Sequence, residues 1–172
     1  MIVWLPRQEA LARKYMISNQ RTAADYGKVE ATHTHEGDTV AAVVDGRVPA
    51  RSDDQDQPRW TSLPFKNRGQ NIIFEFDRPR TVGGIAVYWY EENGGEGEKV
   101  RLPRGWWVDY RVGDGEWTRM KKYITDDYDL QRDKFNVVRP APRLTCDAIG
   151  VRILPQVGFC MGVHEIQVDF AE

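Results

Sequence analysis

The sequence predicts an all-β fold, an antiparallel β-sandwich. Several segments alternate apolar and polar residues with a period of two, and Gly- and Pro-rich loops separate them. No long stretch shows the 3.6-residue apolar period of an amphipathic helix. This combination favours two packed antiparallel sheets over an alternating α/β arrangement. The length of 172 residues, with 41% hydrophobic residues, suits one domain with a core of its own and a short appendage.

The first 28 residues are expected to be a lead-in segment, and the domain proper is expected to span residues 29–172. Met1 to Pro6 is apolar and strand-like, as if it ended a preceding domain. The residues that follow have a helix-forming composition but little apolar face. We therefore expect the β signals to begin near residue 29.

Two strands are expected in the middle of the chain. The segment from Ile72 to Asp77 places its apolar residues on one face and is expected to stop at Pro79. Residues 82–91 are apolar on both faces. Such a strand usually lies in the middle of a sheet or is covered on both sides.

The second half of the chain continues the pattern. Residues 106–112 alternate as a half-buried strand, and Gly113-Asp114-Gly115 predicts a hairpin turn into residues 116–120. Further strands are expected at residues 134–138, 146–154 and 162–170.

Charge and composition limit the partners. The chain has 24 basic and 26 acidic residues, which speaks against non-specific nucleic-acid binding. Its longest apolar runs are far shorter than the roughly 20 residues of a membrane span, so we expect no membrane partner. The two cysteines, Cys146 and Cys160, could form a disulfide or remain as two buried free thiols, and the sequence leaves both alternatives open.

Motifs that carry catalysis are missing from the sequence. It contains no Gly-x-Ser-x-Gly, no His-Glu-x-x-His and no phosphate-binding loop. The glycines at 94, 95 and 97 follow two acidic residues, which a loop for phosphates would avoid, so they are interpreted as a flexible connection. We therefore predict a protein, or part of one, that is not itself an enzyme.

Two segments could hold a metal ion. On a strand His33 and His35 would project to the same face, where both could reach one zinc ion. Carboxylates would have to complete the zinc site, so two surface histidines without a metal are the favoured interpretation. The Asp45-Gly46 turn and the acidic residues 52–56 offer oxygen ligands of the kind that Ca²⁺ prefers. A plain solvated loop is the alternative interpretation.

Aromatic residues are abundant, with six Trp and seven Tyr. Most are expected in the core. Trp107 alternates with Asp109 and Arg111 and should face outward. An exposed indole beside charged neighbours can stack on the apolar face of a sugar ring. Coverage by a loop or a neighbouring domain is the alternative.

A series of ordered motifs in residues 29–170 resembles the factor V/VIII type C, or discoidin, domain. The motifs are Asp45-Gly46, Arg59-Trp60, Ile73–Pro79, Val82–Tyr90, Leu102–Arg111, Trp117 and His164–Val168. Of the variants of this family, the chain is most similar to the C-terminal module of bacterial β-L-arabinofuranosidase-like glycoside hydrolases. In these enzymes a stretch like Val3–Arg7 ends the preceding β-domain. The resemblance implies a galactose-binding-like jelly roll attached to a catalytic domain of the same polypeptide, in a secreted or periplasmic parent enzyme.

The resemblance also implies a structural calcium ion. Its ligands would be the side chains of Asp45 and Glu165 and backbone carbonyls around Ala42, Arg47 and His164. The sequence departs from the family pattern in one place. In this family a Thr and a Trp usually follow soon after Asp-Gly. Here Ser52 stands before an inserted acidic stretch, residues 53–58, and Trp60 follows late, after it.

The sequence therefore predicts a non-catalytic carbohydrate-binding module that takes plant or host polysaccharide through its loops. The candidate sugar contacts are polar or aromatic residues in or beside loops: Trp107, Tyr90, Glu91, His35, Arg101 and Phe159. The alternative is an accessory domain that packs on the catalytic domain and binds no ligand. A lipid-binding or adhesion domain is a third interpretation, which the near-neutral charge disfavours.

Overall fold

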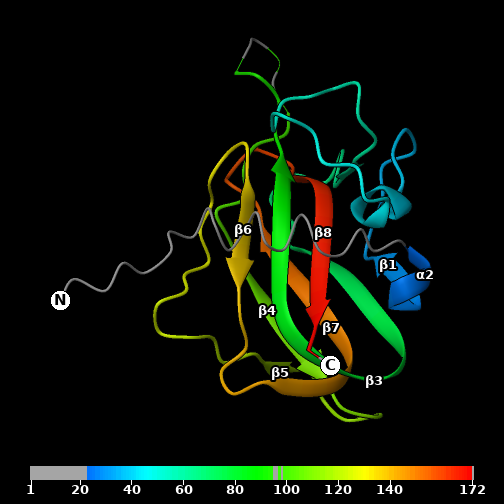
Figure 1. Ribbon diagram of the computed structural model, residues 1–172. Helices are drawn as coiled ribbons and strands as arrows, with labels where there is room; N and C mark the ends of the chain where they lie inside the picture. The colour runs from blue at the N-terminus through cyan, green and yellow to red at the C-terminus, as the bar shows by residue number, and fades with distance from the viewer. Residues whose placement is uncertain (1–22, 95–96, 98, 172) are drawn as a thin grey trace, which may run out of the picture.

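The computed structural model describes residues 23–94, 97 and 99–171 and shows two packed antiparallel sheets (Figure 1). This confirms the predicted all-β sandwich. No helix in the described ranges is long and apolar enough to cross a membrane. The elements in chain order are α2 (Ala23–Tyr26), β1 (Lys28–Ala31), the 3-10 helix η1 (Val40–Val44), β2 (Trp60–Thr61), β3 (Gln70–Tyr90), β4 (Gly105–Arg111), β5 (Thr118–Arg119), β6 (Phe135–Val138), β7 (Leu144–Leu154) and β8 (Gly162–Phe170).

The long strand β3 belongs to both sheets. Its first half pairs with β1 and β7, and β4 and β5 extend that layer beyond β7. Its second half pairs with β8 and β6, and β2 extends this layer beyond β8. The pairing with β7 is interrupted between Glu75 and Arg80, where the strand turns from one layer into the other.

The expected stop at Pro79 was wrong, because the chain stays extended through this corner. A proline has no N–H to give to a ladder, so it usually ends or avoids a paired strand. Between Glu75 and Arg80 no ladder partner is required. Pro79 is therefore tolerated inside a continuous strand.

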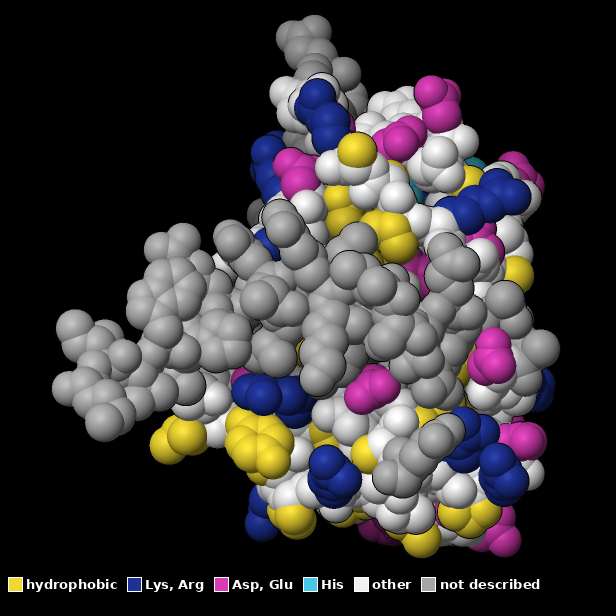
Figure 2. Space-filling view, viewed as in Figure 1, with side chains coloured by type: hydrophobic (Ala, Val, Ile, Leu, Met, Phe, Trp, Pro, Cys, Tyr) yellow, Lys and Arg dark blue, Asp and Glu magenta, His cyan; other side chains and the backbone are white. Residues whose placement is uncertain are grey.

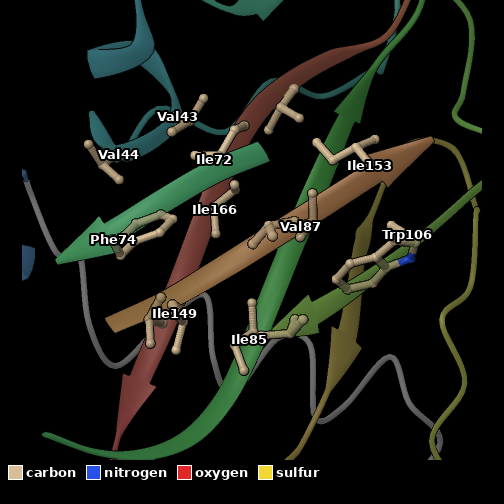
Figure 3. Close-up of a cluster of buried hydrophobic side chains, with 14 of the residues drawn as sticks. Val43, Val44, Ile72, Phe74, Ile85, Val87, Trp106, Ile149, Ile153 and Ile166 are labelled. Atoms are coloured by element: carbon tan, nitrogen blue, oxygen red, sulfur yellow. The ribbon is translucent and has the colours of Figure 1, made fainter. Parts of the chain in front are cut away.

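The core lies between the two layers (Figure 3). Each strand contributes alternate side chains to it, and η1 closes one side of the sandwich with two valines. The second half of β3 also buries its outward side chains, Ala86 and Tyr88, against Phe135 of β6. The prediction of a central strand buried on both faces is thereby confirmed. The core side chains labelled in Figure 3 are Val43, Val44, Ile72, Phe74, Ile85, Val87, Trp106, Ile149, Ile153 and Ile166.

The hairpin predicted at residues 113–115 is present between β4 and β5. The amide of Gly115 donates a hydrogen bond to the carbonyl oxygen of Val112 at 3.1 Å. Gly113 has a φ of 53°, a left-handed conformation that glycine adopts without strain. The turn residues in the sequence therefore predict the turn correctly.

Both cysteines are free and buried. Burial raises the pKa of Cys146 to about 12 and also raises the pKa of Cys160. Of the two interpretations left open by the sequence, the structure shows the free thiols.

Several loops meet at one end of the sandwich, the upper end in Figure 1. β3 and β7 end there, at Tyr90 and Leu154, while β4 and β8 begin there. The connections between these strands therefore lie side by side. We call the described residues of the loops 32–39, 62–69, 91–94, 99–104 and 155–161 together the loop rim.

Candidate functional site: the loop rim

Backbone hydrogen bonds fasten the rim loops to one another. The amide of Ser62 donates to the carbonyl oxygen of Met161 at 2.9 Å, and the amide of Arg101 donates to that of Cys160 at 3.1 Å. The loop 155–161 therefore lies between the loop 62–69 and the segment 99–104. Figure 2 shows hydrophobic, basic and acidic side chains exposed together at this end of the molecule.

Phe65 is the exposed aromatic side chain of the rim, with 39% of its surface accessible. The ring of His33 meets it edge-on at 4.4 Å between centroids, and the guanidinium of Arg68 lies 5.6 Å from the ring centre. Nε2 of His33 lies 2.7 Å from the carbonyl oxygen of Leu63, which fixes the imidazole. Phe65 is thus an aromatic surface held from two sides and open on the rest.

Phe65 is absent from the sugar contacts that the sequence predicted. The sequence does contain a signal for this contact, because Phe65 is an aromatic residue in the short polar loop between Trp60 and Gln70. A core residue is improbable in such a loop, whose backbone runs over the surface.

A second aromatic surface is formed by Phe159, one of the predicted contacts. The guanidinium of Arg101, another of them, lies 3.8 Å from its ring centre. Next to it in sequence, the amide of Gly158 donates to Oδ1 of Asn67 at 2.6 Å. This bond connects the loop of Phe159 with the loop of Phe65, so the structure brings both aromatic surfaces to the same part of the rim.

Tyr90 and Glu91 lie at the base of the rim and are buried. The ring of Tyr90 is covered by the guanidinium of Arg59 at 4.6 Å. The carboxylate of Glu91 forms an ion pair with Arg132. These two predicted residues support the loops from beneath, and their side chains are not presented to solvent.

His35 lies in the first rim loop and is partly accessible. Its Nδ1 accepts a hydrogen bond from the amide of Gly37 at 3.2 Å and lies 3.8 Å from a carboxyl oxygen of Asp38. The imidazole of His33 is engaged elsewhere, by Leu63. Within the described part of the chain no three His, Cys, Asp or Glu side chains gather as metal ligands, and the two imidazoles do not share a site.

Trp107 lies on the outward face of β4, as its alternation predicts, and is outside the loop cluster. The guanidinium of Arg119 lies 4.2 Å from the centre of its ring system. One face of the indole is therefore covered by a charged side chain of the neighbouring strand.

The predicted metal residues Asp45 and Glu165 are brought together by a β-bulge. Tyr88 of β3 pairs with Glu165, but the next residue of β3 pairs with Val163, so His164 is the extra residue. Val163 and Ile166 both enter the core. His164 and Glu165 are consequently directed to the other side of the strand. Bulges of this kind re-aim side chains next to functional sites.

Glu165 is completely buried, and neither of its carboxyl oxygens has a hydrogen-bond partner among the described residues. Burial, and next the negative charge of Asp45, raises the pKa of Glu165 to about 9; the backbone amides of Gly46 and Asp45 oppose this only in part. A buried carboxyl group without a partner is costly. A cation bound between the two carboxylates would remove that cost.

The surroundings suit a hard cation. The amide of Arg47 donates to Oδ1 of Asp45 at 2.8 Å, and Gly46 has the positive φ of 76° that this tight turn requires. The imidazole nitrogens of His164 face the carbonyl oxygens of Ser52 at 3.2 Å and Pro58 at 3.5 Å. A side-chain role for His164 is thereby excluded, which leaves carboxylate and carbonyl oxygens, the ligands of Ca²⁺.

A hollow of about 350 Å³ lies beside the rim. It is polar, and its walls come from the acidic loop after η1 and from Asn93, which follows the end of β3. The lining residues are Ala50, Arg51, Asp53, Asp54, Gln55, Asp56 and Asn93.

Solved structures share this architecture. A chain from the study of the Streptococcus pneumoniae β-galactosidase BgaA matches with a TM-score of 0.65 and 18% identity, over 84% of this chain and 91% of that one. The Clostridium perfringens module CpGH89CBM32-5, in complex with GalNAc-β-1,3-galactose, matches with a TM-score of 0.60 and 13% identity, over 82% and 93%. The family 32 module of C. perfringens NanJ, in complex with galactose, matches with 0.58 and 15%, over 82% and 91%.

At these identities the likeness shows the fold. The chain has the β-sandwich fold that carbohydrate-binding modules of family 32 have. No family model matches the sequence, and no curated protein matches it.

Proposed function

We propose that this chain is a non-catalytic carbohydrate-binding module of a glycoside hydrolase and that it binds glycan on the loop rim. The observation that carries the proposal is Phe65, a half-exposed aromatic ring held between His33 and Arg68 at the rim. Aromatic rings of this kind stack on the apolar face of a sugar, while neighbouring polar groups bind its hydroxyls. Structures of the same fold from C. perfringens hold galactose and GalNAc-β-1,3-galactose.

The binding surface combines predicted and newly found residues. Phe65 and Phe159 offer their rings, Arg101 offers a guanidinium group beside Phe159, and His35 offers an imidazole in the rim loop 32–39. We expect a shallow contact with one or two sugar residues. We expect a dissociation constant near the millimolar end, about −4 kcal/mol.

Calcium has a structural role in this proposal. Asp45 and Glu165 would bind it by their side chains, together with carbonyl oxygens around Ala42, Arg47 and His164. The ion would connect the turn after η1 with the bulge of β8. The orphaned carboxyl group of Glu165 supports this assignment.

The experiment is a glycan array, followed by titration calorimetry of the sugars that bind, both with calcium present. Binding that Phe65→Ala weakens supports the proposal. An array without any bound sugar, performed on folded and calcium-loaded protein, contradicts it. The resemblance to the C-terminal module of β-L-arabinofuranosidase-like enzymes predicts that the parent polypeptide carries a catalytic domain that precedes this module.

A second function is favoured by apolar side chains exposed away from the rim. Ile124 is 98% exposed and Tyr123 is 45% exposed, in the segment between β5 and β6. An accessory domain that packs on the catalytic domain would cover such side chains. Deleting residues 29–172 from the parent enzyme distinguishes the two functions, because loss of stability with unchanged glycan affinity indicates the accessory domain.

A further inference from the structure

We infer that the loop rim recognises an acetyl group on the sugar that it binds, through the side chains of Asn67 and Val157. The inference deepens the proposed function and rests on it. It follows from an amide donor and an apolar side chain that two adjoining loops hold next to each other.

Val157 is an apolar side chain presented to solvent at the rim, with 81% of its surface accessible. It lies in the turn 156–159, where the amide of Phe159 donates a hydrogen bond to the carbonyl oxygen of Gln156 at 3.1 Å. Gly158 has a φ of 85°, the positive value that a turn of this kind needs at its third residue. Val157 therefore stands at the outer corner of a closed turn.

Two side-chain hydrogen bonds fix this turn to the rest of the rim. Nε2 of Gln156 donates to the carbonyl oxygen of Leu102 at 2.9 Å. The amide of Gly158 donates to Oδ1 of Asn67 at 2.6 Å. The position of Val157 is thus set by its neighbours in the turn, so a ligand that contacts it has little ordering to impose on the loop.

The side-chain amide of Asn67 is oriented by the same contact. An N–H needs an acceptor, so the oxygen end of the amide faces Gly158 and the NH₂ end is directed elsewhere. Among the described residues Nδ2 of Asn67 has no acceptor, and the residue is exposed. Its backbone has a φ of 60°, a left-handed conformation that Asn adopts more readily than most residues. Asn67 therefore offers an oriented and free donor beside the turn of Val157.

Phe65 lies two residues before Asn67, so a sugar that stacks on its ring has its substituents within reach of both side chains. An acetyl group combines a carbonyl oxygen, which accepts a hydrogen bond, with an apolar methyl group. Nδ2 of Asn67 donates to the oxygen, and Val157 packs on the methyl. A free hydroxyl or amino group lacks the methyl, so the rim favours the acetylated sugar.

Sugars carry acetyl groups as an amide on nitrogen or as an ester on oxygen. Both forms present the same carbonyl oxygen and methyl group. The shared chemistry is therefore the acetyl group, and the experiment needs one arm for each form.

The test compares matched sugars by titration calorimetry in calcium-containing buffer. One arm uses N-acetylgalactosamine and galactose. The other arm uses acetylated xylo-oligosaccharides before and after mild alkaline removal of their acetyl esters. We expect the acetylated member of at least one pair to bind about tenfold tighter, from one hydrogen bond and one buried methyl group. The pair that shows this difference identifies the amide or the ester.

Two variants remove the two parts of the recognition separately. Asn67→Asp keeps an acceptor for the amide of Gly158 but replaces the NH₂ donor by oxygen. Val157→Ser places a residue that turns accept at the same corner and removes the apolar contact. Each variant should lower the ratio of the two affinities within a pair about three- to tenfold.

The matched control is Val112→Ser, because Val112 is an exposed valine, 57% accessible, in the hairpin at the other end of the sandwich. It should bind both members of each pair as the wild type does. Circular dichroism and the melting temperature of each variant report whether its fold is intact.

Several outcomes would overturn the inference. Equal affinities within both pairs, lowered by Phe65→Ala, would refute acetyl recognition and leave the carbohydrate-binding function intact. A preference for the acetylated sugar that both rim variants retain, or that Val112→Ser also loses, would place its origin outside Asn67 and Val157. Binding to phosphatidylcholine vesicles in place of all four sugars would indicate a membrane ligand for Val157. An absence of any sugar binding, on the array as well, would refute the proposed function together with this inference.

Discussion

The buried carboxyl group of Glu165 lies beside the carboxyl group of Asp45, and the negative charge of Asp45 raises the pKa of Glu165. The β-bulge at His164 directs Glu165 out of the core toward the turn that holds Asp45. Two carboxyl groups in this arrangement destabilise the fold unless a proton or a cation lies with them.

Calcium should therefore stabilise the protein. At a calcium concentration about 100 times the dissociation constant, the gain is about 2.7 kcal/mol, which raises Tm by about 5–10 °C in a domain of this size. The variant Glu165→Gln should lose this gain, because the ligand charge is removed. Differential scanning calorimetry with calcium and with EDTA measures it.

Glu116→Gln is the matched control, since it removes an exposed carboxylate from the hairpin at the other end of the sandwich. It should keep the full response to calcium. A wild-type Tm that does not respond to calcium would contradict the metal assignment.

Stability should also depend on pH when calcium is absent. The pKa of Glu165 is raised from 4.5 to about 9, so between these values the folded protein holds a proton that the unfolded chain has released. Rising pH therefore favours the unfolded state, and Tm in EDTA should fall from about pH 5 to pH 9. Unfolding scans across this range measure the slope.

The same scans on Glu165→Gln should show a flatter dependence, because its amide does not titrate. Calcium should flatten the wild-type dependence as well. If Tm of Glu165→Gln in EDTA falls with pH as steeply as that of the wild type, groups other than Glu165 cause the pH dependence.

Phe65→Ala should weaken glycan binding about tenfold or more, corresponding to about 1.4 kcal/mol, because the ring that stacks on the sugar is removed. Its free energy of unfolding should change by less than about 1 kcal/mol, since the side chain is largely outside the core. Calorimetric titration and urea unfolding give the two quantities.

Tyr123→Ala serves as the comparison, because Tyr123 is exposed to a similar extent but lies outside the rim. It should bind glycan as the wild type does. An affinity that both variants lower equally would mean that the rim has no special role.

Trp107→Ala should lower stability by about 1–3 kcal/mol, because the indole on β4 is half-buried and stacks with the guanidinium of Arg119 on β5. Its glycan affinity should stay within about twofold of the wild-type value, since Trp107 lies outside the loop cluster. Urea unfolding and calorimetric titration measure both. A tenfold loss of affinity would instead make Trp107 the sugar contact that the sequence suggests.

The sequence predicted the fold well because side-chain alternation and turn residues are local. The central strand at residues 82–91 and the hairpin at Gly113 could be found without tertiary information. The corner at Pro79 could not, because the sequence does not show that this proline falls where the strand changes sheets and needs no partner.

The site was predicted less completely. Phe159 and Arg101 do meet at the rim, but Tyr90 and Glu91 are buried beneath it. Whether a loop-adjacent residue reaches solvent depends on neighbours from distant segments, such as Arg59 over Tyr90. The approach of Glu165 to Asp45 was implied by a resemblance and depends on a bulge that no local pattern shows.

Glycan binding on the loop rim is tested most directly by mapping a bound sugar on the protein by NMR. Amide chemical shifts would be followed as galactose is added to calcium-loaded protein. We expect the shift changes to concentrate in residues 32–39, 62–69, 99–104 and 155–161. Changes confined to the outward face of β4, or none at saturating sugar, would contradict binding at the rim.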